Sequence, residues 1–309
     1  MFKKLIVLLF FMPVSLSAQF SIRGLFSPEE SYNYVLIYQV TPNAQNYVGN
    51  AKIKNGKFHF ELDSTKTKGI YKLVYALPQE DYNFDIIYNA KEDIEFSFDQ
   101  EAGVHFLKSS ENMLLSSYTR NMNAINQDID NYFSKIKSLD TVVLRNLFLK
   151  KIEVQNAYES NAKETIALSF IKSSKSYVPG NHITFDNYYE NIKKDYFTYV
   201  DFSDIYLLSS NFLINRINHY IFENDDPKTS DISKYRERIA NVYLVLNKAK
   251  VNIKIVLLAQ LWQQMVDLGL DATANYISNR YLLNLSDNHG NTQLVGILKN
   301  FQNISLGSI

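Results

Sequence analysis

The five histidines are the side chains of this sequence best suited to metal binding and proton transfer, because imidazole ligates metals and titrates near pH 7. They are His59, His105, His182, His219 and His289. They stand far apart, and none has a histidine or glutamate partner at a spacing such as His-Glu-x-x-His. The spacing predicts no metal site, and we expect each histidine to be a surface or hydrogen-bonded residue.

Other signatures of catalysis are also missing from the sequence. The chain has no cysteine, which excludes disulfides, thiol nucleophiles and thiolate metal sites. It has neither a glycine-rich loop for nucleotide phosphates nor the Gly-x-Ser-x-Gly turn of hydrolases. We therefore predict no catalytic, cofactor-binding or metal-binding residue and no cofactor, and we expect this chain by itself not to be an enzyme.

Two carboxylates stand close together at Asp201 and Asp204. Read as a catalytic pair, they would support an enzyme that uses carboxylates alone, which is the least favoured function. At the start of a helix, acidic side chains more simply complement the positive end of the helix dipole. We favour this second interpretation.

The best candidate for a binding surface is the aromatic segment 185–199. Its candidate partner-binding residues are Tyr188, Tyr189, Tyr196 and Phe197. Tyrosine is enriched at recognition surfaces. The simpler alternative is that these rings pack the helices together or onto the sheets. If they bind a partner, Tyr188→Ala and Tyr196→Ala should weaken binding without lowering the melting temperature, whereas equal loss of stability would mean that they are core residues.

Composition places the chain among globular proteins with room for roughly two domains. It has 309 residues, of which 46% are hydrophobic, and its formal net charge is zero. Nucleic-acid binding needs a cationic surface that displaces counterions from phosphates. The balanced charge therefore argues against a nucleic-acid partner.

Residues 1–18 have the pattern of a secretory signal peptide. Lys3 and Lys4 precede an apolar run over 5–16, and small residues follow at 15–18. The run is too short to span a membrane, which takes about 20 residues. We predict cleavage before Gln19 and export, with a soluble mature protein in the periplasm or cell envelope and no later membrane span.

Residues 19–108 carry the pattern of an antiparallel β-sandwich or sheet domain. Segment 47–62 predicts two strands around an Asn55-Gly56 turn, a strong hairpin signal. After that turn, Phe58, Phe60 and Leu62 alternate with polar residues, which places them on one face. Further strands are expected over 19–26, 34–40, 69–77, 84–88, 94–98 and 104–107.

Residues 109–289 are expected to form an all-α domain, which gives an α+β fold. Helices are predicted from an N-cap at Ser110 to about 138, after Asp140, and as one long helix from 201 to about 222. In the helix after Asp140, the expected buried face comprises Val143, Leu144, Leu147, Phe148 and Ile152. Gly269 is expected to end a helix and Asp271 to cap the next one. A terminal helix and linker are expected over 290–309.

The order of these parts resembles exported thiol–disulfide oxidoreductases of the TlpA type. It is most similar to the long Bacteroidetes-type members, which carry a domain of unknown function before a thioredoxin-like domain. The matching stretches are Gln19–Gly24, Asn55–Phe60, Val200–Leu208 and Ile304–Ile309. In that family a segment like the last one continues into the thioredoxin-like domain.

The resemblance implies chemistry at a Cys-x-x-Cys pair, which this chain lacks. Either the chain is a fragment without its thioredoxin-like domain, or it is a free-standing relative of the non-catalytic part. We expect first a non-catalytic accessory region that positions the redox domain or holds its substrate or redox partner protein. The alternative is a free-standing periplasmic scaffold that binds a peptide or glycan.

Overall fold

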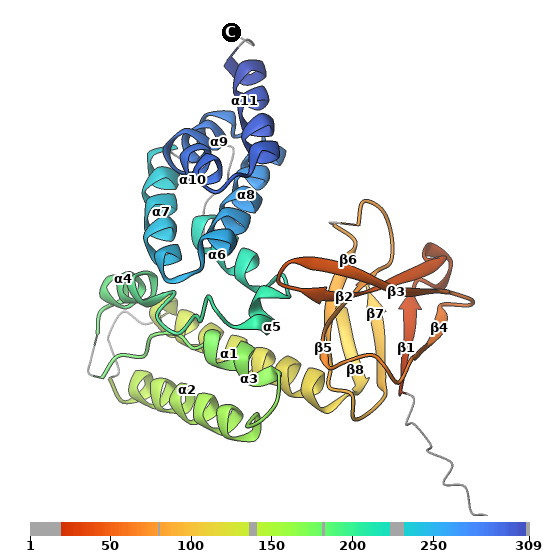
Figure 1. Cartoon of the computed structure of the whole chain (residues 1–309). Helices are drawn as coiled ribbons and strands as arrows, with labels where there is room; N and C mark the ends of the chain where they lie inside the picture. Colours follow the sequence, from red (N-terminus) through yellow and green to blue (C-terminus); the bar gives the residue numbers. More distant parts are fainter. Residues whose placement is uncertain (1–19, 80, 136–140, 181–182, 223–231, 307–309) are drawn as a thin grey trace, which may run out of the picture.

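The computed structural model describes residues 20–79, 81–135, 141–180, 183–222 and 232–306. All strands precede all α-helices in the described chain, and Figure 1 shows the sheets on one side of the molecule with the helices stacked on the other. The predicted α+β class is confirmed. The predicted signal peptide lies outside the described residues.

The β-domain consists of two four-stranded sheets packed face to face. The first sheet has the order β4 (Lys57–Leu62), β1 (Phe20–Ser27), β7 (Ile94–Asp99) and β8 (Gly103–Lys108). The second has the order β3 (Ala44–Lys52), β2 (Tyr34–Thr41), β5 (Gly69–Val74) and β6 (Asn83–Tyr88).

Aromatic rings fill the space between the two sheets. Phe26 is fully buried, and its ring centroid lies 5.1 Å from that of Phe98 and 6.1 Å from that of Phe96. Gly24 leaves room for this packing, because a Cβ atom there would lie only 2.3 Å from Cε1 of Phe58. The core thus depends on large rings beside a residue without a side chain.

The Asn55-Gly56 turn is confirmed, but the predicted hairpin around it is wrong. Both residues have positive φ, 50° and 71°, yet β3 pairs with β2 and β4 pairs with β1. The flanking strands therefore enter different sheets, and two backbone hydrogen bonds between Lys54 and Lys57 close the turn itself. The partner of β3 is fixed instead by a tight turn at Pro42-Asn43, which brings Thr41 opposite Ala44.

The sequence pattern predicted an antiparallel sandwich, but one pair of strands in the structure is parallel. β1 and β7 run parallel, with Ile22 opposite Ile94 and Ser27 opposite Asp99. The chain between them builds the whole second sheet before it returns in the same direction. A long crossover of this kind is what a parallel pair requires.

Strand β5 is buried along its whole length because it has a covered surface on each side. Tyr71 and Leu73 belong to the core of the sandwich. Ile70, together with Ile87 of β6, belongs to the core of the helical domain. The second sheet is therefore the layer through which the two domains pack.

Polar side chains also join the two domains. The Asn112 side chain accepts a hydrogen bond from the Ile87 N–H at 2.8 Å and donates one to the Ile87 carbonyl at 2.7 Å. Lys72, which is buried, donates to Asn83 and Asn211, each at 3.0 Å. These bonds satisfy buried groups that would otherwise be costly.

The helical domain begins with α1 and ends with α11. The helices are α1 (Ser110–Lys135), α2 (Thr141–Asn161), α3 (Ala167–Ser173), α4 (Phe185–Asp195), α5 (Ile205–Leu208), α6 (Phe212–Phe222), α7 (Ile232–Val245), α8 (Val251–Asp267), α9 (Asp271–Ile277), α10 (Leu283–Asn288) and α11 (Thr292–Leu306). In Figure 1, α1 to α3 lie at the base and α7 to α11 rise above them.

Three predictions of helix starts and lengths are wrong. Ser110 is the first residue of α1, and its hydroxyl donates to Glu92 instead of capping the helix. The long helix expected over 201–222 is divided into α5 and α6, because the Asn211 N–H is bound by Asp85 of the β-domain at 2.9 Å. Asp271 is likewise inside α9, which has no side-chain cap.

The C-terminal helices agree better with the sequence pattern. Gly269 has φ of 70° directly after α8, as a helix-ending glycine should. Leu298 of α11 is fully buried in the helical core, and Phe301 packs edge-on against Trp262, with ring centroids 5.3 Å apart. None of the described helices has the length and apolar character that crossing a lipid bilayer requires.

Candidate functional site

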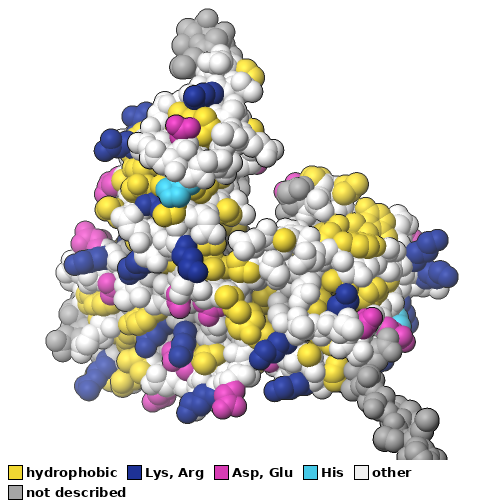
Figure 2. Space-filling model, in the orientation of Figure 1, with side chains coloured by type: hydrophobic (Ala, Val, Ile, Leu, Met, Phe, Trp, Pro, Cys, Tyr) yellow, Lys and Arg dark blue, Asp and Glu magenta, His cyan; other side chains and the backbone are white. Residues whose placement is uncertain are grey.

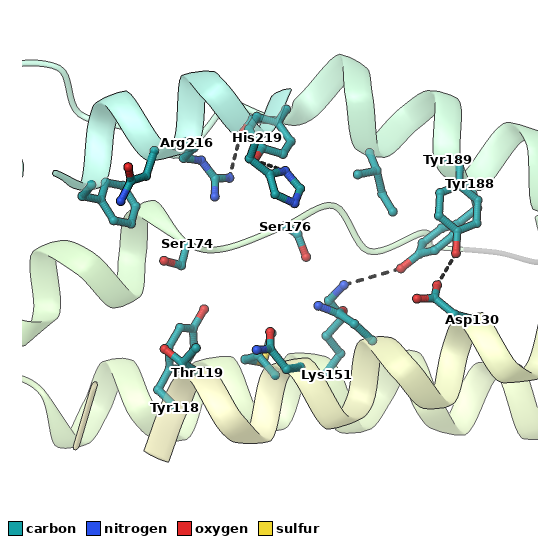
Figure 3. A pocket seen from close by; sticks show the side chains of 17 residues that line it. Tyr118, Thr119, Asp130, Lys151, Ser174, Ser176, Tyr188, Tyr189, Arg216 and His219 are labelled. Atoms are coloured by element: carbon teal, nitrogen blue, oxygen red, sulfur yellow. Dashed lines mark hydrogen bonds between the residues drawn. The ribbon is translucent and has the colours of Figure 1, made fainter. Parts of the chain in front are cut away.

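A cavity of about 580 Å³ lies between helices of the helical domain and is open to solvent on one side, since Asn123, Asp130 and His219 of its lining are exposed. Its walls are formed by α1, α2, α4, α6 and the segment that follows α3. Its size falls in the range of pockets that hold small molecules. Figure 3 shows Lys151 and Arg216 reaching into this space from opposite walls.

Helix α2 places a lysine on its buried face. Its buried positions are Leu144, Phe148, Lys151 and Gln155, which step by four, three and four residues. The expected inclusion of Val143 and Ile152 in that face is wrong, because these residues are 44% and 41% exposed. The helix thus presents two polar residues where the sequence pattern predicted an apolar stripe.

The Lys151 ammonium is almost completely removed from solvent. The residue is only 2% exposed, and its Nζ has one hydrogen bond in the described structure, to the Tyr188 hydroxyl at 3.4 Å. Burial lowers the pKa of Lys151 from 10.5 to about 8, an effect that Asp130 partly offsets. A lysine in this state has spare donors directed at the cavity.

Arg216 of α6 supplies the second cation. Its Nη2 donates to the Tyr196 carbonyl at 2.7 Å, and its guanidinium lies 4.3 Å from the centroid of the Tyr196 ring. Its buried Nε has no hydrogen-bond partner in the described structure. Burial lowers the pKa of Arg216, although nearby tyrosines partly oppose this effect.

Asp130 is the acidic side chain on the wall of this cavity. Its carboxylate accepts a hydrogen bond from the Tyr189 hydroxyl, as Figure 3 shows. His219 lies on the opposite helix and exchanges a 2.8 Å hydrogen bond with the Tyr196 hydroxyl. The charged lining of the cavity therefore comprises two cations and one carboxylate.

The remaining walls combine rings with small polar groups. The aromatic part is formed by Tyr118, Tyr188, Tyr189, Tyr196 and Phe212. The neutral polar part is formed by Thr119, Asn123, Asn126, Ser174, Ser176 and Asn215. Convergent polar groups in a partly apolar pocket are typical of ligand sites.

The structure separates the four predicted partner-binding residues. Tyr188, Tyr189 and Tyr196 line the cavity, and Phe197 does not. Phe197 is buried against Phe202 and Tyr220, as the packing alternative proposed. Tyr188 is both a residue of the cavity lining and a buried packing residue, and its burial strongly raises the pKa of its hydroxyl. Three of the four predicted residues therefore contribute to a cavity wall, whereas Phe185 and Tyr199 of the same segment are exposed at the surface.

The other candidates for chemistry have local structural roles. The Asp204 carboxylate accepts the backbone N–H groups of Tyr206 and Leu207, so it caps α5. Asp201 accepts both the N–H and the hydroxyl of Ser203. His182 lies outside the described residues. Among the residues that are described, no cluster of histidine and acidic side chains suited to a metal ion is found.

Sequence reasoning missed Lys151, Arg216 and Asp130. A signal for Lys151 was available, because a lysine at the spacing of Leu144 and Phe148 interrupts an apolar stripe. Asp130 and Arg216 carry no comparable signal, because they stand 86 positions apart and line the same cavity only once the helices have folded. Their convergence is a property of the tertiary structure.

The face of the molecule drawn in Figure 2 shows no large patch of one charge. On the face drawn in Figure 2, the described lysines and arginines are interspersed with acidic side chains. The cavity is therefore the candidate functional site. Comparison of the chain with protein-family models, with curated proteins and with solved structures found no match.

Proposed function

We propose that this chain is a non-catalytic binding protein that holds a small polar ligand in the cavity of its helical domain. The observation that carries this proposal is Lys151. A buried ammonium with one long hydrogen bond is expensive to maintain, and proteins rarely bury lysine unpaired. A bound ligand that accepts hydrogen bonds from the Lys151 ammonium would offset the cost of burying it.

The surroundings of Lys151 support binding more than catalysis. A reaction would need a nucleophile or base together with a group that orients it. In the described cavity the ionisable groups are instead engaged by the tyrosine hydroxyls, as with Asp130 and Tyr189 or His219 and Tyr196. The pocket offers hydrogen bonds and apolar contact, which are the requirements of recognition.

Export to the periplasm or cell envelope belongs to the same proposal. Its support is the basic and apolar pattern of residues 1–18. A binding protein in that compartment would meet ligands that enter from outside the cell. The free-standing peptide- or glycan-binding role inferred from the sequence is narrowed by the cavity volume to a ligand of small size.

A second candidate function is that of an accessory region of an exported TlpA-like thiol–disulfide oxidoreductase. The four matching stretches favour it, as does their order in the chain. In this role the cavity, or the surface around it, would hold part of a redox partner or substrate protein. Insulin reduction by the chain alone is expected to be absent, because there is no cysteine to carry the electrons.

Calorimetric titration with a panel of sugars, sugar acids and dipeptides tests the primary proposal. At least one member should bind with one-to-one stoichiometry. Ser176→Trp should abolish that binding, because Ser176 lines the cavity and an indole would fill it. Ser160→Trp is the matched control, since Ser160 is exposed on α2 and outside the cavity lining.

Two results would reject the cavity as the binding site. One is the failure of every panel member to bind the folded protein. The other is a binding constant that Ser176→Trp leaves unchanged while circular dichroism shows that the variant is folded.

A further inference from the structure

Two cations converge on one cavity from opposite helices. Lys151 reaches it from α2 and Arg216 from α6 (Figure 3). Neither forms a direct ion pair with a carboxylate among the described residues: Lys151 donates to the Tyr188 hydroxyl and Arg216 to the Tyr196 carbonyl, and Asp130 acts on Lys151 only from a greater distance. Both therefore keep donors for a ligand.

The pair is deeply placed as well as unpaired. Lys151 is only 2% exposed. The Nε atom of Arg216 is buried and has no hydrogen-bond partner in the described structure. Charge-assisted hydrogen bonds to carboxylate are strongest in such a water-poor setting. The planar guanidinium of arginine matches the oxygen pair of a carboxylate, and Arg216 is a partly exposed residue of the lining.

The charge of the lining selects among anions. Lys151 and Arg216 contribute two positive charges, and Asp130 contributes one negative charge. The excess of one positive charge suits a monoanion, whereas a phosphate monoester carries nearly two negative charges at neutral pH. A carboxylate is thus the better match.

Neutral polar groups define the rest of the ligand. In the described structure no side-chain hydrogen bond engages the amides of Asn123, Asn126 and Asn215 or the hydroxyls of Ser174 and Ser176. These five side chains offer both donors and acceptors around the cation pair. They fit a ligand body with several hydroxyl groups, and the tyrosine rings offer it apolar faces.

We propose that the cavity binds a small hydroxylated carboxylate, of which sugar acids are the representative class, with Lys151 and Arg216 as the cations of the lining that attract its negative charge. This inference rests on the proposed binding function and names the ligand for the same site. The carboxylate would supply the acceptors that the two cations lack, and the amides and hydroxyls would bind the hydroxyl groups.

The experiment compares three probes that share one sugar ring. They are glucuronate, which carries a carboxylate, glucose, which carries no charge, and glucose 6-phosphate, which carries a phosphate. Calorimetric titration at pH 7 should show glucuronate binding at least about 10-fold more tightly than either of the others, the range expected when a charged hydrogen-bond partner is lost.

Two variants test the assigned contacts. Lys151→Met should weaken glucuronate binding by about 10- to 100-fold, and it should weaken glucose binding by a smaller factor. Lys150→Met is the matched control, because the neighbouring Lys150 is exposed and outside the lining, and it should bind as the wild type does. Arg216→Gln should also weaken glucuronate binding, and Arg216→Lys, which keeps the charge, should weaken it less.

The outcomes separate this inference from the proposed function. Equal binding of glucose and glucuronate would overturn the carboxylate assignment and leave the cavity as a binding site. Tighter binding of glucose 6-phosphate, or unchanged glucuronate binding in Lys151→Met, would overturn it as well. Failure of every sugar acid, while a neutral sugar or a dipeptide of the panel binds in a Ser176→Trp-sensitive manner, would overturn the ligand class alone.

Discussion

The Nζ atom of Lys151 lies 3.4 Å from the hydroxyl oxygen of Tyr188, and this long contact is the one hydrogen bond that the buried ammonium makes in the described structure. A lysine in such a position destabilises the empty protein, because burial disfavours the charged form. That cost can be measured, and it distinguishes a binding residue from a structural one.

Lys151→Met is expected to stabilise the protein. The difference between a pKa of 10.5 in the unfolded chain and about 8 in the folded one corresponds to about 3 kcal/mol at neutral pH. Methionine fills a similar volume without a charge. Urea denaturation at pH 7 should show a gain of about 2–4 kcal/mol in the free energy of unfolding. Lys150→Met, at the exposed neighbour, should change it by less than about 0.5 kcal/mol.

A loss of stability in Lys151→Met would contradict this account. It would mean that the ammonium makes stronger interactions in the folded protein than its single hydrogen bond suggests.

The stability of the wild type should also depend on pH in a defined window. Below pH 8, Lys151 is protonated in both states, so the full cost of burial is present. Between about 8 and 10.5 the unfolded chain holds a proton that the folded protein has released. The free energy of unfolding should therefore rise with pH there, by at most about 1.4 kcal/mol per pH unit.

The pH dependence of stability reports on Lys151 only below the pH at which tyrosine hydroxyls begin to titrate. Tyr118 and Tyr188 share the cavity with Lys151, and burial raises the pKa of both hydroxyls in the folded state. Above pH 10 the unfolded chain loses those protons first, so stability falls. Measurements at pH 7.5–9.5 on wild type and Lys151→Met isolate the lysine, because Asp130, Arg216 and His219 are common to both proteins. Parallel curves would disprove the assigned titration.

Tyr188→Ala should lower stability instead of affecting binding alone. The residue is 2% exposed, and its ring centroid lies 5.2 Å from that of Phe148 and 5.6 Å from that of Phe133. Removing a buried ring leaves a cavity and costs about 3–5 kcal/mol. Tyr199→Ala, at an exposed ring, should cost less than about 1 kcal/mol. Similar thermal melts for the two variants would show that Tyr188 is not a core residue.

Asn112→Ala should weaken the junction between the domains. It leaves the N–H and the carbonyl of Ile87 without their present partners, 2.8 and 2.7 Å away. Unsatisfied buried groups of this kind cost about 1–3 kcal/mol each. Asn131→Ala, the same change at an exposed site on α1, should have little effect. Chemical denaturation of both variants checks the difference, and equal values would contradict the role of Asn112.

Gly24→Ala should destabilise the sandwich, whereas Gly296→Ala should not. A Cβ atom at Gly24 would lie 2.3 Å from Phe58 and 2.8 Å from Phe96, so rings in the core must move, at about 1–3 kcal/mol. A Cβ at Gly296 meets no atom within 4 Å, and alanine stabilises helices by about 1 kcal/mol over glycine. Melting temperatures should therefore shift in opposite directions, and a shift in the same direction would refute the packing argument.

Local sequence patterns predicted which segments fold into strands and helices, because burial on one face imposes a period on the residues. They did not predict which strands pair. Asn55 and Gly56 report only that the chain turns, and whether β4 continues beside β3 or crosses to β1 is decided by contacts such as that of Phe58 with Phe26. Such contacts join residues 32 positions apart.

The candidate site was predictable only in part. Three of the four residues proposed in the aromatic segment line the cavity, and their role in binding stays a prediction. The two cations of the lining were not predicted. The buried face of α2 was inferred from its apolar residues alone, and Ile152 was assigned to the face that Lys151 occupies. The role of a polar residue on the buried face of a helix depends on the side chains across the cavity from it. For Lys151 these side chains belong to α6, which is distant in the sequence.

The side chain of Asn112 has a consequence for how this protein behaves when many copies are close together. Strand β6 is the outermost strand of its sheet, and a bare outer strand invites strand addition by a neighbouring chain. At Ile87 the outward-facing N–H and carbonyl are already occupied by an amide that belongs to the first helix. Helix α1 therefore blocks the addition of a strand from another molecule at Ile87. Loss of the Asn112 amide would promote aggregation as well as unfolding.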